Sequence, residues 1–355
     1  MSLEIEKEIS DSQDKNLSES TLCLWCGAKN ANFKTIQKGY QEPELFKIFC
    51  CDSCNTAFSL PRINSNAVYE LIYKNASKVQ GYSRYQHYQE RVLLEKDPLD
   101  YLVNNEPSYW GTTHAIKHML KLDKNARILE VGSGLGYFTY SLKKAGYNIQ
   151  GLDISQEAVS EANMKFGDYY ICDDLHHYAT LNLESYDLVI MTEVIEHFNE
   201  PKEFLISINK LLKLNGVLVF TTPNKSFYPA SVLWYTDAPP VHCWWFSEKS
   251  IEHIASLLKM QLQFVDFSNY YKKHPFINKI ENLNNQGHFV FDTDGNVIKR
   301  QTIKPDGIEM PKWIKKLRIY NIIRNSLFIR LYPEKYKTGG VQSSVICAVL
   351  YKNKL

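Results

Sequence analysis

The stretch Ile128–Phe138 constrains the fold more than any other part of the chain. It reads ILEVGSGLGYF, so four strand-forming residues run directly into glycines at alternate positions, Gly132, Gly134 and Gly136. The amphipathic segment Tyr137–Lys144 overlaps its end. This order predicts a buried strand, a tight turn and a helix, because glycine adopts positive φ and lets a ligand approach the backbone.

Acidic residues follow the next two predicted strands. Asp153 closes the strand 148–153, and its distance of about 20 residues from the glycine loop suits an acceptor for a ribose diol. Asp173 and Asp174 follow the strand 169–172. Further strands are expected near 127–132, 187–192, 216–222, 261–268 and 343–352, with helices near 136–145, 155–166, 201–213 and 247–259. Strands that alternate with helices predict an α/β fold with a doubly wound parallel sheet.

Further segments strengthen this pattern and follow in a fixed order. They are Tyr186–Met191, Thr192–His197, Gly216–Asn224 and Pro239–Ser247. Together with the glycine loop, they resemble the class I S-adenosylmethionine (SAM) dependent methyltransferases over roughly residues 108–268 and the last strand. The resemblance implies a seven-stranded Rossmann-like sheet of order 3-2-1-4-5-7-6, with the last two strands at an antiparallel edge.

The resemblance also implies how SAM is bound. Its methionine part should lie on the glycine turn, its ribose hydroxyls on Asp153, and its adenine amino group on Asp173, with Asp174 as the competing choice. The full set of expected cofactor contacts is Glu130, Gly132, Gly134, Gly136, Asp153, Asp173, Asp174 and Thr192.

Four residues should form the acceptor side: Glu193, Glu196, His197 and His242. One set of roles is a histidine base polarised by a carboxylate, which we favour slightly. Another is a divalent metal held by these side chains, in addition to the zinc site described below. A third possibility is that they only cap a helix and pair structurally. The E-x-x-E-H run resembles small-RNA 2′-O-methyltransferases, and it also occurs in ubiquinone-pathway and glycan methyltransferases, so it does not fix the acceptor.

Four cysteines near the start of the chain have the spacing of a metal site. Cys23 and Cys26 form one C-x2-C knuckle, and Cys51 and Cys54 form a second. Two knuckles can close a tetrahedral zinc site, and four thiolates leave no open position, which predicts a structural zinc ribbon. A disulfide pair or free thiols are the alternatives. Cys50 adjoins the second knuckle and is expected to be an ordinary strand residue.

Composition narrows the function classes. The 355 residues carry a net charge of +2, and 44% are hydrophobic and 23% charged, which is typical of a globular protein. The only basic residues of segment 21–60 are four lysines, which argues against a nucleic-acid-binding ribbon. The chain shows neither a secretory signal nor an apolar run of membrane-spanning length, so we expect a cytoplasmic protein. A basic amphipathic stretch at 312–332 would allow peripheral contact with the inner face of the membrane, although a solvated helix face explains it too.

These observations predict a division of the chain and an activity. The expected parts are a disordered tail (1–20), a zinc ribbon (21–60), a helical connector or lid (61–107), the SAM-binding core (108–269), an insertion (270–341) and the last core strand (342–355). Tyrosines and a tryptophan of the connector, among them Tyr69 and Tyr85, should cover the cofactor or acceptor unless they serve only helix packing. Trp244 and Trp245 would stack on a sugar ring or pack in the core.

The combination of zinc knuckles, the EVIEH run and the P-P-x-H loop looks like bacterial surface-polysaccharide and sugar methyltransferases. We therefore expect SAM-dependent methylation of a hydroxyl on a sugar, a sugar nucleotide or a cell-surface glycan, with a lipid-linked glycan included. The alternatives are a metal-dependent RNA 2′-O-methyltransferase and a zinc-ribbon interaction protein with a degenerate methyltransferase fold. The intact glycines and Asp153 argue against the last.

Overall fold

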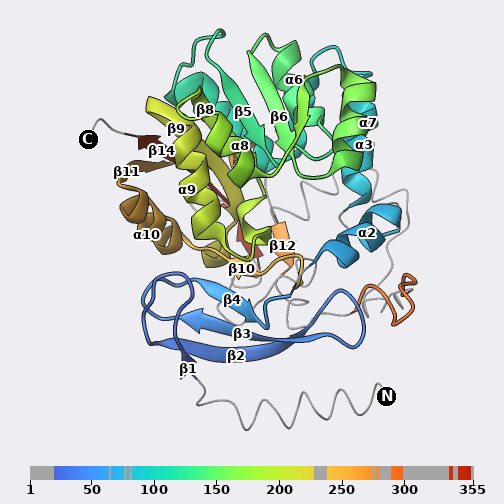
Figure 1. Ribbon diagram of the computed structural model, residues 1–355, viewed down its shortest axis with the longest axis vertical. Coiled ribbons are helices and arrows are strands. Elements are labelled where there is room, and N and C mark those ends of the chain that lie inside the picture. The colour runs from blue at the N-terminus through green and yellow to red at the C-terminus, as the bar shows by residue number, and fades with distance from the viewer. Residues whose placement is uncertain are drawn as a thin grey trace.

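The computed structural model describes residues 20–63, 65–75, 78–79, 82–227, 238–274, 277–279, 289–298, 336–338 and 343–352 (Figure 1). The predicted tail, apart from Ser20, and the basic stretch 312–332 lie outside the described residues, as does most of the predicted insertion. No helix in the described part of the chain is long and apolar enough to cross a membrane.

The larger sheet has the predicted topology. In the described residues it contains seven strands in the order β11-β14-β9-β8-β5-β6-β7. The five strands from β9 to the edge strand β7 run parallel, whereas β14 is antiparallel to both β9 and β11. The strands are β5 (Ile128–Val131), β6 (Ile149–Asp153), β7 (Tyr170–Cys172), β8 (Tyr186–Thr192), β9 (Leu212–Pro223), β11 (Met260–Phe264) and β14 (Val345–Lys352). This order confirms the predicted 3-2-1-4-5-7-6 sheet.

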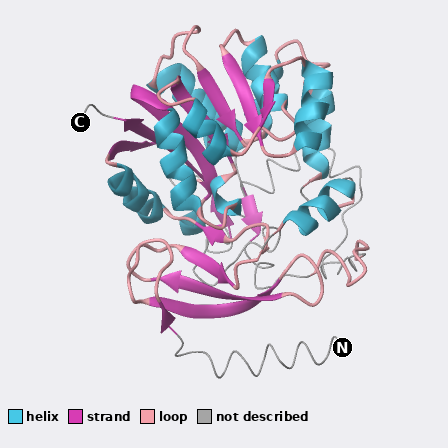
Figure 2. Ribbon diagram, in the orientation of Figure 1, coloured by secondary structure: helices cyan, strands magenta, loops and turns pink. Residues whose placement is uncertain are grey.

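Helices cover both faces of this sheet (Figure 2). A hydrophobic core lies on each face of the sheet, as strand β8 illustrates. Leu188 and Ile190 pack into the core on one face, and Val189 and Met191 pack into the core on the other. A strand that alternates between two buried faces must be apolar throughout. The covering helices are α6 (Tyr137–Lys144), α7 (Gln156–Phe166), α8 (Leu175–Leu181), α9 (Pro201–Leu211) and α10 (Glu248–Leu258).

The predicted connector is helical. Its described residues contain α2 (Asn66–Lys74), α3 (Ser83–Arg91) and α4 (Pro98–Asn105). Helix α5 (Pro107–His114) begins at its last residue, and α5 and the π-helical turn η1 (Ala115–Met119) lie in the segment predicted as the start of the core. Pro98 and Pro107 each occupy the first turn of a helix, where the missing N–H costs nothing, so each proline marks the start of a helix.

A second sheet lies beside the first and contains the N-terminal strands. Within the described residues its order is β1-β2-β3-β4-β10, and every pairing is antiparallel. Its strands are β1 (Ser20–Thr21), β2 (Ala31–Lys38), β3 (Leu45–Cys51), β4 (Ala57–Leu60) and β10 (Trp244–Trp245). Strand β10 comes from the segment between β9 and α10, so the part of the chain that forms the larger sheet also contributes a strand to the smaller one (Figure 1). The sequence did not predict this pairing.

The remaining described elements are short. They are the 3-10 turns η2 (Ile195–His197) and η3 (Lys225–Phe227), helix α11 (Ser268–Lys273), and the strand pair β12 (Ile277–Lys279) and β13 (Tyr336–Thr338).

Candidate functional site

The glycine turn after β5 has an open side. Gly132, Gly134 and Gly136 all have positive φ. A Cβ on Gly132 would lie 2.7 Å from Val194, and one on Gly136 would lie 2.7 Å from Ala162, so both glycines are required by packing. A Cβ on Gly134 would meet nothing within 4 Å. The turn therefore presents bare backbone to open space, as a cofactor cradle requires.

Glu130 lies beneath this turn rather than on its open side. The residue is 2% exposed, and Thr139 Oγ1 donates a hydrogen bond to its Oε2. Burial raises the pKa of the Glu130 carboxyl to about 8. Its observed contact fixes β5 to α6, and direct contact with the cofactor stays a prediction.

Asp153 stands at the carboxyl end of β6, next to the glycine turn. Its carboxylate accepts hydrogen bonds from Gly134 N at 2.7 Å and from Ser155 N at 2.9 Å. The adjacent Ile154 is an exposed apolar residue, with 74% of its surface accessible. Ile154 was not among the residues predicted from the sequence, although an apolar residue directly after the acid predicted to bind ribose could have marked it as a candidate surface for a flat ring.

The structure separates the roles of the next two acids. Asp174 caps α8 and accepts hydrogen bonds from His176 N and His177 N at 2.8 and 3.1 Å. Asp173 has no part in this cap and contacts His177 Nδ1 at 2.8 Å. This arrangement favours Asp173 as the adenine contact, because removing Asp174 from its cap would leave helix N–H groups unpaired.

Thr192 ends β8 and leads into a strained residue. Glu193 has a φ of 56°, and its backbone N donates to Thr221 O at 3.1 Å. Ser108 Oγ, at the start of α5, donates to Glu193 Oε1 at 3.0 Å. A left-handed conformation at a residue with a long side chain costs free energy and is held here by these contacts on both sides.

Three of the four predicted acceptor-side residues come together. Ligand atoms of Glu196, His197 and His242 all lie within 4.8 Å of one another. The rings of His197 and His242 are perpendicular, with centroids 4.4 Å apart. Glu193 does not belong to this group, which we call the E-H-H cluster. Two segments therefore converge as predicted, but the set contains one carboxylate rather than two.

Hydrogen bonds orient the members of the E-H-H cluster. Thr222 Oγ1 donates to Glu196 Oε2 at 2.9 Å, and Glu196 is 1% exposed. His197 Nδ1 lies 2.9 Å from Val241 O and 2.8 Å from the Tyr69 hydroxyl. Because a carbonyl oxygen can only accept, Nδ1 carries the proton, and this tautomer directs the lone pair of Nε2 toward a proton or a metal.

His242 is neutral over the ordinary pH range. Burial, aided by the charge of Arg84, lowers its pKa to about 3. A neutral imidazole suits a metal ligand, whereas so low a pKa makes a weak general base. This low pKa argues against His242 as the general base.

The four predicted zinc ligands form a compact cluster. The sulfurs of Cys23, Cys26, Cys51 and Cys54 lie within 4.8 Å of one another, with Sγ–Sγ distances of 3.7 Å (Cys23 to Cys54) and 3.6 Å (Cys26 to Cys51). Sulfurs held about 2.3 Å from a tetrahedral zinc lie roughly 3.8 Å apart, and a disulfide would need about 2.05 Å. All four thiols are free, so the donor set fits zinc. Cys50 lies outside the cluster.

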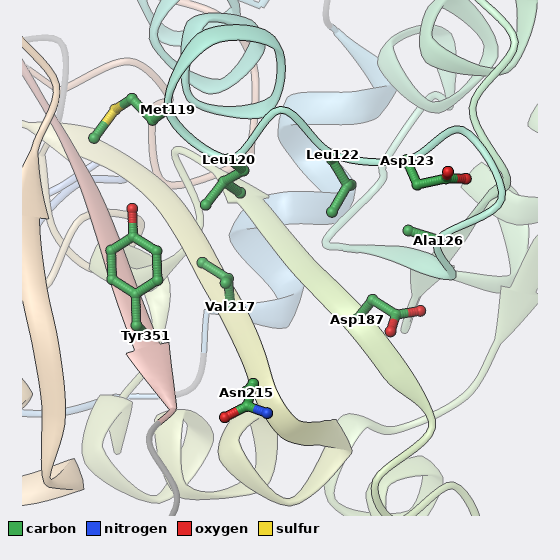
Figure 3. Close-up of a pocket in the computed structure, with 9 residues that line it drawn as sticks. All are labelled: Met119, Leu120, Leu122, Asp123, Ala126, Asp187, Asn215, Val217 and Tyr351. Atoms are coloured by element: carbon green, nitrogen blue, oxygen red, sulfur yellow. The ribbon is translucent and has the colours of Figure 1, made fainter.

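Two further features do not belong to the site. Trp244 and Trp245 are 2% and 1% exposed, so both pack in the core and neither offers a face to a sugar. A cavity with a volume of about 580 Å³ has Leu122, Val217 and Tyr351 in its lining. Figure 3 shows the side chains around it. Its lining includes Asp187, at the amino end of β8. The cavity therefore lies at the amino ends of the parallel strands, whereas the glycine turn lies at their carboxyl ends.

Part of the chain is similar to known methyltransferases. Residues 105–258 match the family described as a methyltransferase domain. The chain is similar to the ubiquinone biosynthesis O-methyltransferases of Aromatoleum aromaticum (26% identity, 34% of this chain and 58% of the relative) and Hydrogenovibrio crunogenus (31% identity, 29% and 45%). It thus spans about half the length of these curated relatives. A SAM-dependent methyltransferase from Archaeoglobus fulgidus superposes with a TM-score of 0.42 at 16% identity, over 69% of this chain and 94% of that structure.

Proposed function

We propose that the methyltransferase domain in residues 105–258 transfers the methyl group of SAM to a hydroxyl oxygen of a sugar, a sugar nucleotide or a glycan. One observation carries this proposal. Val194 packs directly against Gly132 in the glycine turn, and the E-H-H cluster begins two residues later at Glu196. This contact supports a site in which the E-H-H cluster accepts a proton or binds a metal close to a cofactor on the glycine turn.

The residues at the cradle fit SAM. The open side of Gly134 would hold the methionine part, the Asp153 carboxylate would accept the ribose hydroxyls, and Ile154 would cover one face of the adenine. Asp173 would accept the adenine amino group. When bound there, SAM supplies an electrophilic methyl group on a sulfonium.

The chain must align the acceptor and remove its proton. In-line displacement forms an O–CH₃ bond and breaks the S–CH₃ bond, leaving a neutral thioether and releasing one proton from the hydroxyl. His197 Nε2 is the group placed to take this proton, because its Nδ1–H is held by Val241 O. The positive charge that develops on the imidazole would be balanced by Glu196 in the same cluster.

The same residues can hold a divalent metal instead. Glu196, His197 and His242 supply one carboxylate and two imidazoles, a donor set used for Mn²⁺, Fe²⁺, Co²⁺ or Zn²⁺. A bound cation would lower the pKa of a coordinated hydroxyl. The neutral state of His242 is compatible with either role.

Polar surroundings support a sugar rather than a flat apolar ring as the acceptor. Near the E-H-H cluster, the Tyr69 hydroxyl contacts His197, and the Ser108 hydroxyl contacts Glu193. Arg84 Nη2 donates to the Tyr85 hydroxyl at 3.1 Å, and its charge reaches His242. Polar groups that line a site favour ligands that can hydrogen-bond to them. The similarity to ubiquinone biosynthesis O-methyltransferases makes an acceptor from ubiquinone biosynthesis the competing choice.

Two measurements test the proposal. Isothermal titration calorimetry with SAM should show binding, and its absence would defeat the activity and favour an interaction protein with a degenerate fold. Mass spectrometry should then show methylated product from a panel of nucleotide sugars and glycan fragments. The panel includes a catechol and a short RNA, and methylation of one of these alone would replace the sugar proposal.

A further inference from the structure

The chain segment that carries His242 lies between the core and the ribbon. On the core side, Cys243 N donates to Glu196 O at 3.0 Å, and Lys225 N donates to Phe246 O at 2.8 Å. On the ribbon side, β10 pairs with β4 through Trp244 and Trp245, and Ser59 N donates to Cys243 O at 3.1 Å. The position of His242 is therefore set by pairing with ribbon strand β4 as well as by its own core.

The metal-binding knuckles contact the same segment directly. Trp25, between Cys23 and Cys26, is fully buried, and its ring lies 5.6 Å from that of Trp244 and 4.8 Å from that of Phe246. Its Nε1 donates to Ser250 O at 2.9 Å. This aromatic packing depends on the backbone turn of the Cys23–Cys26 knuckle, because that turn holds Trp25 in place.

The second knuckle makes an independent connection. Cys54 O accepts hydrogen bonds from Ser247 Oγ at 3.3 Å and Ser250 Oγ at 3.4 Å, and these two serines cap α10 directly after β10. Asn55 Oδ1 accepts from Lys225 Nζ at 2.6 Å. Both knuckles therefore hold the segment that runs from the E-H-H cluster into α10.

The ribbon also reaches the other half of the cluster. The Arg62 guanidinium, just beyond β4, lies 4.0 Å from the Trp244 ring centroid and donates to Asn199 O at 3.1 Å. Asn199 follows His197 by two residues. Trp244 Nε1 donates to Phe198 O at 2.8 Å, which joins the two cluster-bearing segments to each other.

We propose that the four-cysteine ribbon is a positioning part of the acceptor site. With metal on Cys23, Cys26, Cys51 and Cys54, the ribbon holds residues 242–246 against Glu196, and loss of that metal disorders the E-H-H cluster while the glycine turn stays intact. The effect of zinc loss on methyl transfer rests on the proposed function. The structural coupling does not, because it concerns only contacts within the chain.

Hydrogen–deuterium exchange of the full-length protein tests this coupling. Cys26→Ser removes a ligand, and Cys50→Ser is the matched control on the same ribbon, outside the cluster. In Cys26→Ser the peptide covering 243–246 should exchange at least about tenfold faster, as expected for local opening, while peptides from β5 and β6 keep their protection. SAM affinity should stay within about twofold of the unmodified protein, because the cradle makes none of these contacts.

Two outcomes would overturn the inference. Unchanged protection of 243–246 in zinc-free Cys26→Ser would show that the core alone holds this segment. Equal loss of protection in β5 would show that zinc stabilises the whole protein rather than this segment. If Cys26→Ser does not fold, Trp25→Ala in zinc-loaded protein gives the same comparison, with Trp25→Phe expected to restore protection. Failure of the unmodified protein to bind SAM would defeat the proposed function and leave this test unaffected.

Discussion

The imidazole rings of His197 and His242 stand perpendicular, 4.4 Å apart between centroids, although the two residues come from different loops. Each ring is held from outside the pair. His197 Nδ1 contacts Val241 O, and the residue after His242 donates its N–H to Glu196 O. This pairing is the basis for our proposal that the methyl acceptor binds at the carboxyl ends of β8 and β9.

The two histidines should be needed for methyl transfer and not for SAM binding. We expect His197→Ala to lower kcat by about 10²–10⁴, the usual contribution of general acid–base catalysis. His118→Ala is the control, since His118 is exposed on η1. Full activity in both His197→Ala and His242→Ala would show that the E-H-H cluster has only a structural role.

Metal dependence separates the two versions of that chemistry. If the E-H-H cluster holds a cation, dialysis against a chelator should abolish activity, and Mn²⁺ or Co²⁺ should restore it. Circular dichroism must accompany this measurement, because the four-cysteine cluster is also exposed to chelation. Activity that survives removal of all metal except ribbon zinc would leave the histidine base as the mechanism.

Asp153 should contribute strongly to SAM affinity. Asp153→Ala removes a charged acceptor and should weaken SAM binding by about 2–3 kcal/mol, measured by calorimetry. Asp174→Ala is the matched control at the next strand end, because that carboxylate caps α8 and should affect stability by about 1 kcal/mol instead. Unaltered SAM affinity in Asp153→Ala would contradict the ribose assignment.

Two glycines of the same turn should respond differently to alanine. Gly136→Ala places a Cβ 2.7 Å from Ala162 Cβ at a φ of 79°, so we expect a loss of unfolding free energy of about 2–3 kcal/mol. Gly134→Ala meets nothing within 4 Å and should cost about 1 kcal/mol, yet SAM affinity should fall, because the new methyl group occupies the cradle. Denaturant titration and calorimetry on both variants test this contrast. Equal SAM affinity in Gly134→Ala and the unmodified protein would place the cofactor elsewhere.

Glu130 should make stability depend on pH. Burial raises its pKa from 4.5 to about 8, so the folded state retains a proton that the unfolded state releases. This contribution is complete below about pH 4.5 and is lost as pH rises toward 8, by at most about 1.4 kcal/mol per pH unit. In SAM-free protein, urea unfolding should show a steeper fall in stability between pH 6 and pH 8 than in Glu130→Gln. Parallel curves for the two proteins would show that Glu130 is ionised when folded.

The sheet was predictable because its signals are local. Apolar strands such as Ile128–Val131 are buried on both faces, and glycines and prolines mark where the chain turns, so strand order followed once the motifs were aligned with the family. Helix α8 was missed because its sequence, LHHYATL, is short and carries two histidines. Its start depends on the Asp174 cap.

By itself, the sequence determined the residue types that can carry chemistry: the glycine turn, the acids at the strand ends, two C-x2-C knuckles and the E-x-x-E-H run. The tertiary structure decided which of them meet. Glu196, His197 and His242 form one cluster without Glu193, because the left-handed backbone at Glu193 turns its side chain toward Ser108. Likewise, β10 pairs with the ribbon because two tryptophans bury their rings there, and pairing between distant segments has no signature in either segment alone.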